Sequence, residues 1–278
     1  MKSMTAYIDG HSIAADVRMQ RQVHKGSFLL FEGNTDYKRL KKIVDEGRCC
    51  TIICFGKDNV VDAVDRLSDD GTPGILGLVD ADFDRVLNRL PVADNLIVSQ
   101  AHDYDLDIMM TNALDRYFFE VADDAKVKAQ AASGAAVTSV FVGVLESLRP
   151  LSALRYANEK EQLGYKLTDL DVADFFDGTT VSVVKLVDVC SQGRFSDAAS
   201  KQRLSATIAG YAALNMDLYQ ISSGHDACAA VGIALRDVIG RRKKSRHGAL
   251  KLNCTCASPW IGWIWSSADL CQKFDSGR

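Results

Sequence analysis

Short apolar runs alternate with amphipathic segments through the first 120 residues of the chain. The runs lie at 28–31, 50–55, 75–79 and 96–99. They show little polar alternation, which predicts strands buried on both faces, as in a parallel sheet. Between the runs, apolar positions recur every three or four residues, which predicts helices. Strands that alternate with helices predict an α/β fold with a mostly parallel, four-stranded sheet flanked by helices.

Beyond residue 120 the pattern becomes mainly helical. Alanine-rich helical patterns run from about 123 to 148, 181 to 190, 197 to 214 and 226 to 240, and Pro150 and several glycines separate them. We therefore expect a short lead-in segment over 1–26, an α/β domain over 27–120 and a mostly helical region over 121–278.

Composition places the chain among ordinary globular proteins. It has 278 residues, of which 47% are hydrophobic, and a formal net charge of −3. The charge gives no global sign of nucleic-acid binding, so such a role must rest on local patches. The sequence contains neither a signal-peptide pattern nor an apolar stretch of about 18 residues. We therefore expect no membrane association, a cytoplasmic location, and reduced thiols at the eight cysteines.

Carboxylates follow three of the four predicted strands: Glu32 and Asp36 after the first, Asp80 and Asp82 after the third, and Asp105 and Asp107 after the fourth. The carboxyl ends of parallel strands meet at one edge, where α/β sheets bind ligands, so we expect these side chains to converge. Clustered carboxylates cannot all stay ionised without a compensating cation, so such a cluster is either partly protonated or a metal site. Hard oxygen ligands select Mg²⁺ or Mn²⁺. The sequence therefore predicts one firmly held ion and a second held conditionally, and two ions would clamp a phosphodiester.

Some of these features also have structural interpretations. Asp36 opens a predicted helix, where an acid stabilises the positive end of the dipole by about 0.3–1 kcal/mol. Asp103 is expected to be a solvated loop residue. Cys254 and Cys256, with His247 nearby, hint at zinc, but C-x-C lacks the usual two-residue spacing.

Several cationic residues are candidates for contact with phosphate. Lys57 and His225 each follow a glycine at a predicted helix start, where free N–H groups bind phosphate. A solvated lysine and a capping histidine are the alternatives. The densest positive patch consists of Arg241, Arg242, Lys243, Lys244 and Arg246. It could follow a nucleic-acid backbone, meet an acidic partner or be solvated.

All three tryptophans of the chain lie in one short strip at 260–265. The strip is too short to span a bilayer, so it indicates a docking segment or an interface. A homodimer is one assembly that such an interface would allow.

Three motifs resemble the Toprim signature in its OLD-like form, in which E-G-x-x-D, D-x-D and a later D-x-E bind divalent metal. They are F-E-G-N-T-D at 31–36, G-L-V-D-A-D at 77–82 and D-L-D at 105–107. The segments G-K-D-N-V at 56–60 and G-H-D at 224–226 resemble short motifs of stand-alone members. Asp107 stands where the family usually has Glu, so either Asp105 or Asp107 is the ligand.

The resemblance implies a Toprim fold over 27–120 and a metal-dependent nuclease. It implies that Glu32, Asp80 and Asp82 hold the principal ion, while Asp36 and Asp107 help to hold a second. Stand-alone members are similar to toxic effectors of anti-phage defence systems, such as the nuclease subunit of PARIS-type systems. The implied substrate is DNA, tRNA or another RNA, and the implied partner is a controlling ABC-type ATPase.

Other functions compete with this one. The chain could be a non-catalytic regulatory or binding subunit of an ATPase complex, or could have another Toprim phosphotransfer activity. A topoisomerase would need a tyrosine nucleophile on a further domain. A phosphatase of the haloacid dehalogenase type would use Asp80 as nucleophile and Asp82 as acid. That class places its D-x-D after the first strand, whereas here it follows the third.

Overall fold

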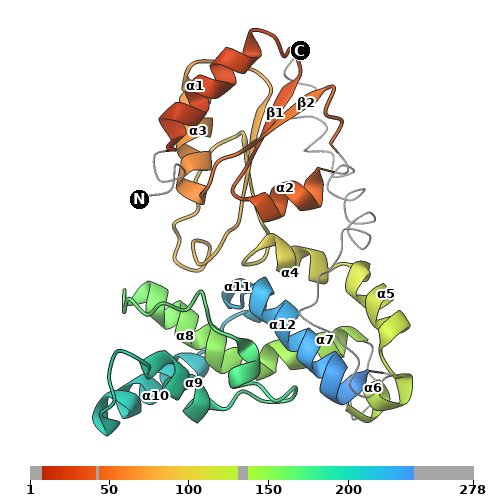
Figure 1. Cartoon of the computed structure of the whole chain (residues 1–278), viewed down its shortest axis with the longest axis vertical. Coiled ribbons are helices and arrows are strands. Elements are labelled where there is room, and N and C mark those ends of the chain that lie inside the picture. Colours follow the sequence, from red (N-terminus) through yellow and green to blue (C-terminus); the bar gives the residue numbers. More distant parts are fainter. Residues whose placement is uncertain (1–7, 42–43, 131–136, 241–278) are drawn as a thin grey trace. The chain divides into compact units, whose positions relative to one another are not determined.

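The computed structural model describes residues 8–41, 44–130 and 137–240 (Figure 1). These residues form two compact units. The first unit holds the described residues up to Ala81 together with Leu90–Gln100, and the second holds Asp82–Arg89 and the described residues from Ala101 onward.

The first unit is built on a four-stranded parallel sheet with strand order β2-β1-β3-β4. The strands are β1 Ser27–Phe31, β2 Cys49–Ile53, β3 Ile75–Val79 and β4 Leu96–Val98. Phe31 lies opposite Ile53 of β2 and Leu78 of β3, so these strands end nearly level. The predicted fold class, a parallel sheet flanked by helices with a helical C-terminal region, is confirmed.

Helices cover both faces of this sheet: α1 Gly10–Arg21, α2 Asn34–Leu40 and α3 Lys57–Asp69. Successive side chains of a strand point to opposite faces. Phe28 and Leu30 of β1 pack in one cluster with apolar residues of α1 and α3. The ring of Phe31 instead contacts Tyr37 of α2, at a centroid distance of 6.1 Å. Helices α1 and α3 therefore lie side by side on one face and α2 lies on the other (Figure 1).

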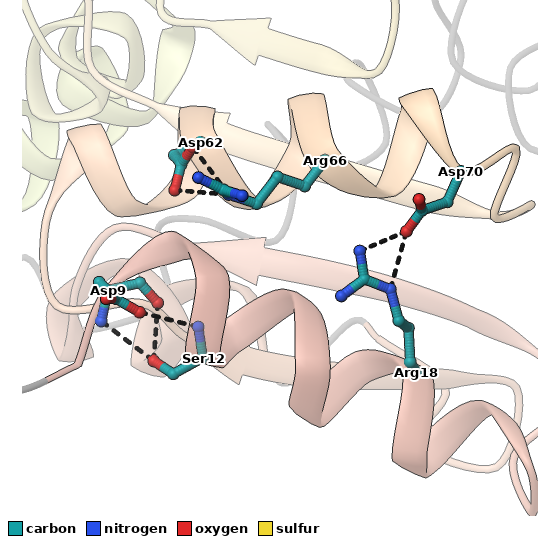
Figure 2. A network of polar contacts seen from close by, with 6 residues as sticks. All are labelled: Asp9, Ser12, Arg18, Asp62, Arg66 and Asp70. Atoms are coloured by element: carbon teal, nitrogen blue, oxygen red, sulfur yellow. Dashed lines mark hydrogen bonds and ion pairs between the residues drawn. The ribbon is translucent and has the colours of Figure 1, made fainter.

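Polar contacts fix the ends of α1 and α3 (Figure 2). Asp9 caps α1, since its Oδ1 accepts a hydrogen bond from the Ser12 N–H at 2.8 Å. Arg18 of α1 pairs with Asp70 just after α3, and a second ion pair lies within α3. These side chains are exposed, so the ion pairs add little to stability. We assign the network to helix packing and not to a functional site.

Gly77, in the middle of β3, allows α3 to lie directly on the sheet. A β-carbon at this position would lie 2.8 Å from methyl groups of Val60 and Val64. We expect Gly77→Ala to lower the free energy of unfolding by about 1–3 kcal/mol, because the core must expand to accept the methyl group. Urea unfolding measures the change. Gly210→Ala is the matched control, because a β-carbon there meets nothing within 4 Å. A loss at Gly77 no larger than that at Gly210 would contradict the packing argument.

The described part of the second unit is mainly helical. Its helices are α4 Tyr104–Met109, α5 Asn112–Val121, α6 Asp124–Gln130, α7 Val137–Ser147, α8 Arg149–Lys160, α9 Val183–Ser191, α10 Ala198–Ala212, α11 Leu218–Ile221 and α12 Gly224–Ala234, with a 3₁₀ turn at Val172–Asp174 and a π-helical turn at Leu235–Ile239. Helix α12 contributes Ala227, Ala230 and Val231 to the core. Helix α8 is missing from the sequence prediction, which placed a break at Pro150. Proline starts this helix because its missing N–H has no partner in a first turn.

Two further findings concern the helices and cysteines among the described residues. None of the described helices is both long enough and apolar enough to cross a membrane. The described cysteines are free thiols: Cys49, Cys50, Cys54, Cys190 and Cys228. Burial raises the pKa of Cys54 to about 12 and that of Cys190 to about 11, so both remain protonated at neutral pH.

Candidate functional site

Glu32 and Asp80 meet at the carboxyl edge of the sheet in the first unit. Glu32 directly follows β1 and Asp80 directly follows β3, which is the parallel neighbour of β1. The backbone N–H of Asp80 donates to Oε2 of Glu32 at 3.4 Å. The carboxyl oxygens of an aspartate cannot lie far from its own backbone nitrogen. The strand order therefore brings these two predicted ligands into one small region.

Lys57 reaches the same edge from the start of α3. It is the first residue of that helix, and its Nζ donates to the carbonyl of Ala81 at 3.2 Å, directly after Asp80. The N–H of the preceding Gly56 donates to the carbonyl of Glu32 at 3.0 Å, which ties the start of α3 to the end of β1. A half-buried cation and two carboxylates thus lie at the same end of neighbouring strands.

Asp36 lies in the first turn of α2, as the sequence predicted. Its Oδ2 is 3.7 Å from the position that a β-carbon on Gly33 would occupy. An acid in this place meets the positive end of the helix dipole. The geometry supports the structural role of Asp36, and its role as a metal ligand stays a prediction.

Asp82 begins the second unit in a left-handed backbone conformation. Its φ is +48°, in the left-handed region that residues other than glycine adopt infrequently. The N–H of Asp82 donates to the carbonyl of His102 at 2.6 Å, and Oδ1 of Asp107 accepts from the N–H of Ala101 at 2.7 Å. Asp82 and Asp107 are therefore attached to consecutive residues of one loop.

His102 is buried beside Asp82. Its ring meets that of Phe83 edge-on, at a centroid distance of 4.6 Å. Burial lowers the pKa of His102, while the neighbouring Asp82 carboxylate acts in the opposite direction. Burial is the larger influence, so the imidazole is neutral at pH 7 and adds no positive charge beside Asp82.

The start of α4, which carries Asp103 and Asp105, packs against the start of α12. Asp105 therefore has different surroundings from Asp107. Oδ1 of Asp103 accepts from the Leu106 N–H at 2.9 Å, and its Oδ2 accepts from the Gly224 N–H at 2.7 Å. A β-carbon on Gly224 would lie 2.4 Å from that of Asp105, so only glycine fits here. The expectation that Asp103 is a solvated loop residue was wrong, since its carboxylate joins two helix starts.

The G-H-D motif contains one exposed and one buried side chain. His225 lies exposed in the first turn of α12. Asp226 is buried and forms a two-point ion pair with Arg155 of α8: Nε to Oδ2 at 2.5 Å, and Nη2 to Oδ1 at 2.8 Å. Arg155 also donates to the Leu167 carbonyl at 2.9 Å. Sequence reasoning identified the motif and missed Arg155, because 71 positions separate the partners.

The remaining sequence candidates lie outside the described residues. These are the basic patch of Arg241, Arg242, Lys243, Lys244 and Arg246, the tryptophan strip, and Cys254 and Cys256 with His247.

The donor set at the sheet edge fits magnesium better than a metal that needs several protein ligands. Within the described ranges, no three or more His, Cys, Asp or Glu side chains are grouped so that they could hold a metal ion. Mg²⁺ keeps several waters and binds through one or two carboxylates together with substrate phosphates. Glu32 and Asp80 could provide the one or two carboxylates of such an ion, and their role as ligands stays a prediction.

No protein-family model matches the chain, and no curated protein matches it. The Toprim assignment therefore stays a prediction that rests on its motifs.

Proposed function

We propose that this chain is a Mg²⁺-dependent nuclease that hydrolyses phosphodiester bonds in DNA or RNA. The observation that supports it most is that Glu32, Asp80 and Lys57 lie at one carboxyl edge of a parallel sheet. A bound divalent ion supplies Lewis-acid stabilisation of charge on the phosphate and activates water at neutral pH.

In the first unit, the acidic residues would bind the metal ion and the lysine would bind the substrate phosphate. Glu32 and Asp80 would hold the principal ion through their carboxylate oxygens. Lys57 would bind an oxygen of the substrate phosphate, because it begins α3, where backbone N–H groups favour anions, and its ammonium group lies at the carbonyl of Ala81, next to Asp80. The resemblance adds Asp36 and Asp82 as further ligands, and these stay predictions.

Of the two acids in the D-L-D motif, Asp107 is the one that lies near Asp82 within the second unit, and we propose it over Asp105 for the role that the resemblance implies. Its carboxylate is attached to the Ala101–His102 loop, to which Asp82 is also bound. The side chain of Asp105 instead starts against Gly224 of α12.

The wider proposal is that an ABC-type ATPase controls this nuclease in an anti-phage defence system. Its support is the resemblance to stand-alone OLD-like Toprim effectors. Co-purification of the full chain with a P-loop ATPase encoded beside it, and toxicity that depends on that ATPase, would test this part separately from the chemistry.

The nuclease proposal is tested with the purified full chain on single-stranded DNA, duplex DNA and tRNA. We expect cleavage with Mg²⁺ or Mn²⁺ and none with EDTA. An Asp80→Asn preparation, purified in parallel, reports any contaminating nuclease.

A partner can restrain the enzyme, so calorimetry measures Mn²⁺ binding directly, and we expect the Asp80→Asn variant to bind Mn²⁺ more weakly than the wild type does. Equal cleavage and equal Mn²⁺ binding by the two proteins would overturn the proposal. Metal binding without cleavage under any condition would favour the regulatory-subunit alternative.

A further inference from the structure

Phe55 is a large aromatic side chain left partly in solvent at the carboxyl edge of the sheet. It is 44% exposed, although it lies between the buried Cys54 and the half-buried Gly56. Single exposed apolar residues are ordinary on protein surfaces. The exposure becomes informative only together with the backbone and the position of this residue.

The backbone of Phe55 is held in a conformation that phenylalanine disfavours. Its φ is +58°, and among the described residues of the first unit it is the only one other than glycine with a positive φ. Asparagine and aspartate tolerate this region, whereas a bulky side chain there is unusual. Strain of this kind persists only where the surrounding structure enforces it.

Two hydrogen bonds hold the backbone of Phe55 in this conformation. The N–H of Cys54 donates to the carbonyl of Phe31 at 2.8 Å, and the N–H of Gly56 donates to the carbonyl of Glu32 at 3.0 Å. The chain is therefore attached to the end of β1 on both sides of Phe55. The attachment fixes the backbone of an aromatic residue between the strand end that carries Glu32 and the helix start that carries Lys57.

We propose that Phe55 stacks against an unpaired base next to the phosphate that is cleaved, which makes single-stranded or looped nucleic acid the substrate class. This inference rests on the proposed nuclease function. Aromatic side chains bind successive bases of single strands by stacking, with little dependence on sequence. A base inside a duplex is already stacked on its neighbours and has no free face for the ring. Because the backbone that carries the ring is attached to β1 on both sides, little backbone freedom is lost on contact.

The test compares Phe55→Asn and Phe55→Trp in the full chain. Asparagine accepts the left-handed backbone and removes the ring, while tryptophan keeps an aromatic face. Anisotropy measures the binding of a short labelled single strand and of the matching duplex, with Ca²⁺ in place of Mg²⁺ to prevent cleavage. We expect Phe55→Asn to bind the single strand about 5- to 150-fold more weakly, with duplex binding unchanged. We expect Phe55→Trp to bind close to the wild type.

Val92→Asn is the matched control, because Val92 is 98% exposed in the same unit. It should bind both ligands as the wild type does, and thermal unfolding should show all variants folded. Equal binding of the single strand by the wild type and Phe55→Asn would overturn this inference, and metal-dependent cleavage by the wild type would then leave the nuclease proposal standing. A wild type that binds no nucleic acid would overturn both.

Discussion

Glu32→Gln is expected to reduce nucleic-acid cleavage by about a thousandfold or more and to leave the fold intact. The glutamine amide oxygen can still accept the Asp80 N–H, so the contact between the two strand ends survives. A neutral amide is a much poorer ligand for Mg²⁺ than a carboxylate is. A thousandfold loss corresponds to about 4 kcal/mol of transition-state stabilisation, which is in the range that a bound metal supplies. Single-turnover cleavage and thermal unfolding measure the two effects.

Glu46→Gln controls for the substitution itself. Glu46 is exposed and pairs with Lys41 at 3.3 Å. The cleavage rate of this variant should equal that of the wild type. If Glu32→Gln were folded and also cut at the wild-type rate, the carboxylate of Glu32 would have no part in the chemistry.

Asp226→Ala is expected to lower the free energy of unfolding by about 3–5 kcal/mol. The side chains of Arg155 and Asp226 are 17% and 4% exposed, so the pair is largely removed from water. Without the carboxylate, the guanidinium charge stays in the interior next to the Leu167 carbonyl. Such a loss is a large fraction of the stability of an ordinary domain. Urea unfolding followed by circular dichroism measures it.

Two further variants locate the cause of that loss. Asp188→Ala removes an acid from an exposed pair with Lys201 and should cost about 0–1 kcal/mol. The double replacement of Arg155 by Met and Asp226 by Leu should recover much of the stability, because no unpaired charge is then buried. A double variant as unstable as Asp226→Ala would show that the buried charge is not the cause.

The strands could be predicted from the sequence because each forms a short apolar run of the length that a parallel sheet requires. The strand predicted at 75–79 coincides with β3. Glu32 and Asp80 could be placed together for the same reason, since they follow strands that parallel pairing aligns. Helix α8 was missed because proline marks either the end or the start of a helix, and Pro150 was assigned to the wrong one.

Contacts between distant segments could not be predicted. The Arg155–Asp226 pair depends on how α8 packs against α12, and the role of Asp103 depends on the approach of Gly224. No local pattern marks the ion pair, and the N-cap position of Asp103 before α4 gives no sign of its second bond, to Gly224. The left-handed backbone at Phe55 is also invisible in the sequence, because hydrogen bonds to β1 impose it against the preference of the residue.

In the first unit, the backbone path determines the position of the proposed site, whereas the side chains at that position determine its chemistry. From β1 the chain moves outward to β2, and it later returns to the other side of β1 to form β3. The connection after β1 leads to β2 and the connection after β3 leads to β4, so the two leave in opposite directions and neither passes from the end of β1 to the end of β3. The position of this strand junction is thus a property of the backbone path, and the two acids would give it the proposed chemistry. A descendant that lost both acids would keep the strand junction and could acquire a different activity through a few substitutions at the ends of these strands.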